Sequence, residues 1–305
     1  MKKIIITLAA AFALIAGVTA FKNIYSCELP IKNRGIKNAL QADGLEVLFL
    51  GSSAFRSDID MGMMDEAYDG KAYDIAYGSN QLVAAAVQYD EISRRAETAP
   101  KLMVFELGPM MLTQDVALSD SRVIWDLSFE GKKELWERMY EAEDMDFSDA
   151  HQYFMTSGMD DLITFPVTEP FYATRYYKGA KTEIGASPGE EYLENEEFDI
   201  SGETLEKAQA KAIRDIVSEC KRDGQEFIFV ETPRYHRLSE DPTFVRYREE
   251  FIKILDECGA PYILASDMNI DTHDPVLFED MNHMSEAGRK AYTAELVKAL
   301  GSKDQ

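Results

Sequence analysis

Short apolar runs alternate with amphipathic stretches along most of the chain, and this alternation predicts parallel strands connected by helices. Runs with few charges are typical of strands that are buried on both faces. Five strands are predicted, at residues 46–50, 72–76, 101–107, 227–230 and 262–264. Helical spacing predicts helices at 81–95, 202–220 and 244–258, and a last one carrying Tyr292, Leu296 and Leu300. We therefore expect a three-layer α/β/α sandwich around a mainly parallel five-stranded sheet.

The pattern loosens between the third and fourth predicted strands, where residues 110–202 are interpreted as a helical insertion within a domain spanning 45–305. Residues 165–177 are rich in aromatic side chains. They are interpreted as core packing, with the lining of a substrate groove as the alternative. Residues 179–198 are acidic and punctuated by Gly and Pro, which predicts an exposed loop.

The N-terminus combines two lysines with an uncharged apolar stretch from Ile4 to Phe21. This stretch is longer than a signal-peptide core of about 7–15 residues and slightly shorter than a spanning helix of about 20. Residues 1–21 are therefore predicted to be an uncleaved signal anchor, or a signal peptide cleaved after Ala20. Either places the domain outside the cytoplasmic membrane. Residues 22–44 are polar and are predicted to form a stalk.

Composition narrows the classes of function. The net charge of −23 argues against nucleic acid as a partner and against broad docking on anionic lipids. Three cysteines are too few for a disulfide framework. Cys220 and Cys258 each precede a predicted strand and are interpreted as buried apolar residues, with a bridge between them as the alternative.

Candidate chemistry gathers where predicted strands end. Gly51-Ser52-Ser53, Gly78-Ser79-Asn80, Gly108 and the Asp280–His283 segment all follow strand candidates, so they fall on the same edge of the sheet. A serine hydroxyl needs a histidine to take its proton and a carboxylate to orient that histidine. The order Ser, Asp, His along the chain therefore suggests a serine hydrolase or acyltransferase. The alternative for the two serines alone is a helix cap.

A metal site is the competing interpretation of the acidic, histidine-containing C-terminal region. His273, Asp274, Asp280 and His283 have a spacing that matches no closed zinc pattern. The sequence therefore predicts no metal and no cofactor.

The motifs at these strand ends resemble those of the SGNH (GDSL-like) hydrolase superfamily. The resemblance is strongest to the membrane-anchored bacterial branch that includes the D-alanyl-lipoteichoic acid biosynthesis protein and related envelope acyl-modifying proteins. The matching segments are Leu50-Gly51-Ser52-Ser53, Tyr77-Gly78-Ser79-Asn80-Gln81, Val104-Phe105-Glu106-Leu107-Gly108, Thr232-Pro233 and residues 280–288.

The resemblance implies that Ser53 is the nucleophile, His283 the base and Asp280 its partner. Ser52 stands where the best-known family motif has Asp, which makes it a second candidate for the attacking serine. The backbone N–H of Gly78 is implied to donate to the oxyanion. The family's third motif supplies an Asn to the same hole, but here that stretch reads Gly108-Pro109-Met110-Met111, and Asn80 is taken as a substitute.

Together these features predict an extracytoplasmic serine esterase or O-acyltransferase. Its expected substrate is an acylated cell-envelope glycan or polymer, and a membrane-bound acyltransferase is a candidate partner. Two alternatives are a catalytically weak relative that binds such a polymer or scaffolds an acyltransferase, and a metal-dependent hydrolase.

Overall fold

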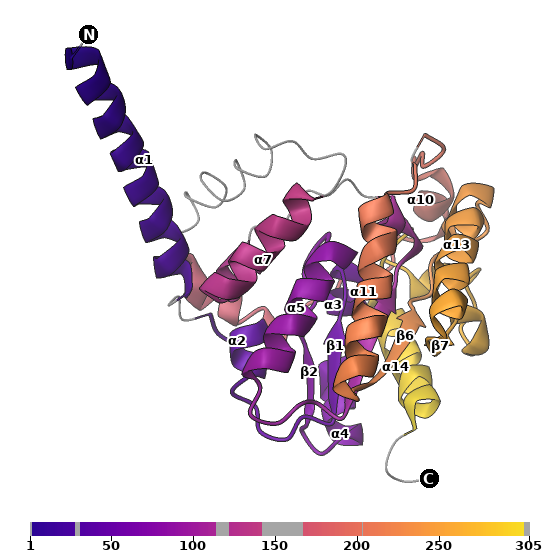
Figure 1. Ribbon diagram of the computed structural model, residues 1–305. Coiled ribbons are helices and arrows are strands. Elements are labelled where there is room, and N and C mark those ends of the chain that lie inside the picture. Colours follow the sequence, from indigo (N-terminus) through magenta and orange to yellow (C-terminus); the bar gives the residue numbers. More distant parts are fainter. Residues whose placement is uncertain (1, 28–30, 114–121, 142–166, 203, 302–305) are drawn as a thin grey trace.

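The computed structural model describes residues 2–27, 31–113, 122–141, 167–202 and 204–301, and it contains the predicted parallel sheet (Figure 1). The sheet has five strands in the order β2-β1-β3-β6-β7. Every neighbouring pair is parallel. The strands are β1 (Val47–Leu50), β2 (Ala72–Asp74), β3 (Leu102–Leu107), β6 (Glu226–Glu231) and β7 (Tyr262–Ile263). The predicted fold class is confirmed.

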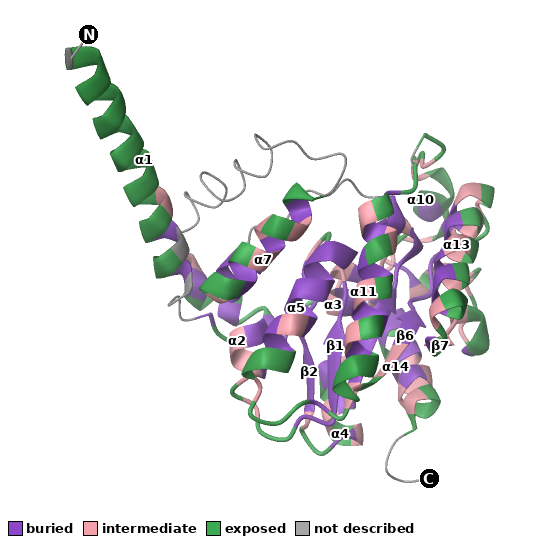
Figure 2. Cartoon of the chain, in the orientation of Figure 1, coloured by how far each residue is buried: buried purple, intermediate pink, exposed green. Residues whose placement is uncertain are grey.

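Alternating side chains of the strands build a core on each face of the sheet. Leu48 and Leu50 of β1 pack into the cluster that contains α5 (Leu82–Arg95) and α11 (Lys207–Asp223). Val47 and Phe49 pack into the opposite cluster, with α4 (Met61–Ala67) and α14 (Glu286–Leu300). Helix α13 (Pro242–Cys258) contributes side chains to both clusters. The buried sheet with helices outside it is visible in Figure 2.

The following elements complete the described part of the chain. Near the N-terminus these are α1 (Lys2–Cys27), α2 (Ile36–Ala39) and α3 (Ser53–Asp58). The insertion contains η1 (Pro109–Leu112), α6 (Arg122–Asp126), α7 (Phe129–Tyr140), the antiparallel strands β4 (Tyr176–Tyr177) and β5 (Ala180–Lys181), and α10 (Glu190–Asn195). After β6 come α12 (His236–Ser239), η2 (Ala265–Asp267) and η3 (Pro275–Leu277).

Helix α1 contains an apolar span, Lys3–Ser26, whose length and composition would allow it to cross a membrane. A signal sequence can have the same length and composition. The described residues of segment 22–44, predicted to be a stalk, include helical structure. Helix α1 continues to Cys27, and Ile36 and Ala39 of α2 are buried in the core. These buried side chains attach α2 to the domain.

The segment 179–198, predicted to be an exposed loop, contains secondary structure. This segment includes β5 and α10, and Leu193 of α10 is fully buried. In the aromatic stretch, Phe171 is 70% exposed whereas Tyr176 is buried, and Phe165 lies outside the described residues. Core packing therefore holds for only part of that stretch.

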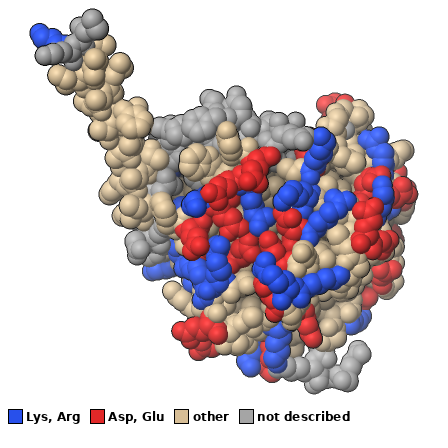
Figure 3. All heavy atoms as spheres, in the orientation of Figure 1, with Lys and Arg blue, Asp and Glu red and all other residues tan. Residues whose placement is uncertain are grey.

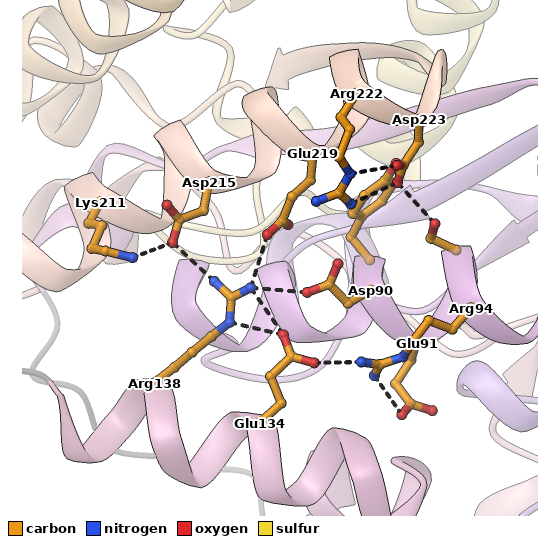
Figure 4. A network of polar contacts seen from close by, with 12 residues as sticks. Asp90, Glu91, Arg94, Glu134, Arg138, Lys211, Asp215, Glu219, Arg222 and Asp223 are labelled. Atoms are coloured by element: carbon orange, nitrogen blue, oxygen red, sulfur yellow. Dashed lines mark hydrogen bonds and ion pairs between the residues drawn. The ribbon is translucent and has the colours of Figure 1, made fainter.

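A polar network fixes helix α7 of the insertion to helices α5 and α11 (Figure 4). The guanidinium of Arg138 on α7 lies within 3.1 Å of carboxylates from Asp90, Glu134, Asp215 and Glu219. Burial and the neighbouring carboxyls raise the pKa of Asp90 to about 8. This excess of carboxylates reflects the acidic composition, although basic side chains are interleaved with acidic ones on the same face (Figure 3).

Helix α14 approaches the backbone of η3 so closely that only glycine fits at position 288. A Cβ atom at Gly288 would lie 1.9 Å from the carbonyl oxygen of Leu277. We expect Gly288→Ala to lower the free energy of unfolding by about 2 kcal/mol, because the helix must move away from η3. Chemical denaturation of the full chain measures this. Gly202→Ala is the control, since a Cβ there meets nothing within 4 Å. Equal stability of the two variants would contradict the expectation.

Candidate active site

The turn after β1 places two adjacent serines in different roles. Ser52 is the N-cap of α3, and its hydroxyl oxygen accepts a hydrogen bond from the backbone N–H of Ala54 at 3.3 Å. Ser53 is the first residue of the helix, and its Oγ lies 2.9 Å from Nε2 of His283. The turn therefore uses one serine as a cap and directs the other towards the histidine.

The loop before α14 brings the histidine and its carboxylate together. One oxygen of Asp280 accepts hydrogen bonds from the backbone N–H groups of Asn282 and His283, at 2.7 and 2.8 Å. The other oxygen lies 2.9 Å from Nδ1 of His283. With Nδ1 protonated and donating to Asp280, Nε2 is left to accept the Ser53 hydroxyl proton. Ser53, His283 and Asp280 thus form one continuous hydrogen-bonded chain.

The ionisation of this pair suits proton transfer. Burial lowers the pKa of His283, but its hydrogen bond to Asp280 and the charges of Asp58 and Asp280 outweigh that effect, so the pKa is raised. Burial raises the pKa of Asp280, but hydrogen bonds from the side chain and backbone of His283 and from Asn282 bring it below its usual value. The carboxylate therefore stays charged while the imidazole gains and loses its proton.

The predicted oxyanion donors are the backbone N–H groups of Ser53 and Gly78. Within the described residues, no hydrogen bond is found from the N–H of Ser53 or of Gly78. The segment of Gly78 is fixed beside the turn, because the N–H of Tyr77 donates to the carbonyl of Gly51 at 3.1 Å. The guanidinium of Arg56 lies against Gly78, with Nη2 2.8 Å from where a Cβ would stand.

The structure argues against Asn80 as the substitute oxyanion donor. Its side chain is buried, and its amide nitrogen donates to the carbonyl of Gly51 at 3.2 Å and to Oε1 of Gln88 at 2.8 Å. Both amide hydrogens are therefore already used inside the protein. Asn80 instead holds the end of β1 against α5.

Three charged residues near this site were given no role by the sequence motifs. Glu106 lies within the matching segment Val104–Gly108 as the penultimate residue of β3, Arg234 follows the Thr232-Pro233 motif, and Asp58 is the last residue of α3. All three are buried. A carboxylate within a strand that is otherwise buried and apolar was the one local signal, because such a group requires a partner.

A separate cluster has the composition of a metal site. One ligand atom from each of His236, Glu240 and His273 lies within 4.8 Å of the others. The rings of His236 and His273 are stacked at 4.2 Å, and His236 also pairs with Glu194 at 2.9 Å. His273 faces Glu240 whereas His283 faces Ser53, so the metal set considered from the sequence is not brought together.

Neither free cysteine, Cys220 or Cys258, forms a disulfide.

Comparisons with known proteins give matches among solved structures only. No protein-family model and no curated protein matches the chain. The chain is similar to the crystal structure of an acetyl xylan esterase, with 11% identity, 84% of this chain and 99% of that chain covered, and a TM-score of 0.39. It is also similar to a catalytic mutant of an acetylxylan esterase from Geobacillus stearothermophilus, with 14% identity, 85% and 96% covered, and a TM-score of 0.42.

Proposed function

We propose that the protein is a serine esterase or O-acyltransferase that acts on acyl esters. The observation that carries this proposal is the continuous chain from Ser53 Oγ through the His283 ring to Asp280, with both links at 2.9 Å. This is the arrangement that serine nucleophiles require, and it is recognised by geometry rather than by chain order. The motif resemblance to SGNH hydrolases supports the same chemistry.

In the proposed reaction, Ser53 Oγ attacks the ester carbonyl carbon and its proton passes to Nε2 of His283. The carbonyl oxygen becomes an oxyanion that accepts the N–H groups of Ser53 and Gly78. His283 then protonates the departing alcohol oxygen, which leaves an acyl-Ser53. Water or an acceptor hydroxyl attacks this ester, and its proton passes through His283 to Ser53. Asp280 orients the imidazole and stabilises its charged form throughout.

The proposed setting is the outer side of the cytoplasmic membrane, and the proposed substrate is an acylated cell-envelope glycan or polymer. The apolar span within α1, preceded by lysines, supports an anchored or exported protein. Water as the acceptor makes the protein an esterase, whereas a sugar hydroxyl makes it a transferase. A membrane-bound acyltransferase is the proposed partner in the second case.

A fluorophosphonate probe tests the proposal on the full chain in detergent. An activated Ser53 displaces fluoride from phosphorus and becomes covalently labelled. We expect one phosphonylated site, found at Ser53 by peptide mass spectrometry. Absence of labelling would favour the second candidate function, a non-catalytic polymer-binding or scaffolding protein. The observation that favours this candidate is that Asn80, the expected third donor, is committed to Gly51 and Gln88.

The pH dependence follows from the raised pKa of His283. Only the neutral imidazole can accept the Ser53 proton, so kcat/KM should rise with pH as His283 loses its own proton. Because the pKa of His283 is raised, the midpoint should lie above the ordinary value of 6.5. Hydrolysis of p-nitrophenyl acetate across pH measures the profile, with Ser53→Ala as the blank. A midpoint at or below 6.5 would contradict this assignment.

A further inference from the structure

A buried group of three charged side chains, called here the Asp58–Arg234–Glu106 cluster, connects the two halves of the site. The side chains of Asp58, Arg234 and Glu106 are 0, 8 and 1% exposed. Arg234 lies 3.6 Å from Oδ2 of Asp58 and 3.3 Å from Oε1 of Glu106. Two carboxylates thus share one guanidinium in the protein interior, where desolvated charges are costly.

The Glu106 end of the cluster fixes the nucleophile turn. Oε2 of Glu106 accepts the backbone N–H of Ser52 at 2.5 Å. The carboxylate also fills the space beside Gly51, where a Cβ would lie 2.7 Å from the same oxygen. This end contacts the residue that precedes Ser53 but makes no hydrogen bond to the loop of His283 among the described residues.

The Asp58 end of the cluster holds the base loop on both sides of His283. Oδ1 of Asp58 accepts the N–H of Met284 at 3.0 Å, and Nη1 of Arg234 donates to the carbonyl of Asn282 at 2.7 Å. The residues before and after His283 are therefore both anchored to buried charges. Oδ2 of Asp58 has no hydrogen-bond partner among the described residues, and it faces the Arg234 guanidinium at 3.6 Å.

We propose that Asp58 is a positioning residue for the base, a second carboxylate whose charge stabilises the imidazolium formed when His283 takes the Ser53 proton. This inference rests on the proposed function. The charged groups that act on His283 are Asp280 on its own loop, Asp58 at the end of α3 and Arg234 after β6. Glu196 after α10 lies near the same loop and accepts the N–H of Met281 at 3.2 Å.

The protonation of Asp58 is linked to that of His283. Burial raises the pKa of Asp58 to about 7, against the opposing effects of His283, Arg234 and the Met284 N–H. In turn, the charge of Asp58 raises the pKa of His283. The protonation state of each group therefore affects that of the other, and the two titrate as a coupled pair.

NMR of histidine Cε1–H groups in the full chain tests this inference without relying on activity. The chain has four histidines, so comparison with His283→Gln assigns the resonance. We expect the His283 resonance of the unaltered chain to follow two titration steps rather than one, because His283 and Asp58 are coupled. Asp58→Asn keeps an acceptor for Met284 N–H but removes the charge. It should lower the pKa of His283 and reduce kcat about tenfold, with KM unchanged.

Glu106→Gln is the matched control, since it neutralises the other carboxylate on Arg234 and keeps an acceptor for Ser52 N–H. It should not lower the pKa of His283. An unchanged His283 titration in Asp58→Asn, or an equal decrease in both variants, would overturn the inference. If Asp58→Asn does not fold, a single-step titration of the unaltered chain overturns it instead. If Asp58→Asn lowers the pKa of His283 but the unaltered chain is not labelled by the fluorophosphonate, only the proposed chemistry is rejected.

Discussion

Ser53→Ala should reduce p-nitrophenyl acetate hydrolysis by a factor of about 10⁴ or more, whereas Ser52→Ala should retain activity within about threefold. The difference arises because only Ser53 Oγ contacts His283, whereas the Ser52 hydroxyl caps α3 through Ala54. Removing the nucleophile stops formation of the acyl-enzyme. Steady-state kinetics and fluorophosphonate labelling of both variants measure the effect.

The adjacent serines make a well-matched pair of variants, since both changes remove one hydroxyl from the same turn. Ser52→Ala should cost about 1 kcal/mol of stability through loss of the cap. A modest decrease in melting temperature with retained labelling is therefore the expected signature of this variant. Labelling that persists in Ser53→Ala and disappears in Ser52→Ala would transfer the nucleophile to Ser52.

Asp280→Asn should lower kcat by about 10³–10⁴ while leaving KM and the fold nearly unchanged. An asparagine can still accept the N–H groups of Asn282 and His283 through its oxygen, so the loop should keep its shape. Its amide nitrogen would then face Nδ1 of His283 as a donor. The imidazole would carry its proton on Nε2, and it could no longer accept a proton from Ser53.

Asp274→Asn is the control for this second prediction. Asp274 also accepts a backbone N–H, from Val276 at 3.0 Å, but it caps η3 rather than contacting a histidine of the site. Its kinetics should match those of the unaltered chain. A tautomer effect would also appear in the nitrogen chemical shifts of His283, which distinguishes it from local unfolding. Activity of Asp280→Asn within about tenfold of the unaltered chain would contradict the role given to Asp280.

The sheet and the Ser53–His283–Asp280 grouping could be predicted because local patterns determine them. Apolar runs such as Val47–Leu50 are buried on both faces, so each strand has a clear signature. Asp280 and His283 are three residues apart, so a single loop brings them together. The position of Ser53 after the first strand then places it at the same sheet edge.

The remaining features depend on contacts between distant segments. Asn80 was a reasonable oxyanion donor from its position, but the Gly51 carbonyl and Gln88 already occupy its amide. Residues 22–44 are polar enough to predict a stalk, yet the buried side chain of Ile36 attaches them to the core. The Asp58–Arg234–Glu106 cluster joins α3, β3 and the segment after β6. Sequence periodicity does not indicate contacts between side chains so far apart in the chain.

The short connection between α1 and the domain limits how far from the membrane the proposed anchored enzyme can act. Ile31 already packs in the core, and α1 ends at Cys27, so the intervening chain spans at most about 14 Å when extended. A domain of this size is about 50 Å across. Without a long flexible linker, such an enzyme could not reach substrates far from the membrane. It would act on polymer that comes close to the membrane, such as newly exported chains still near their point of synthesis.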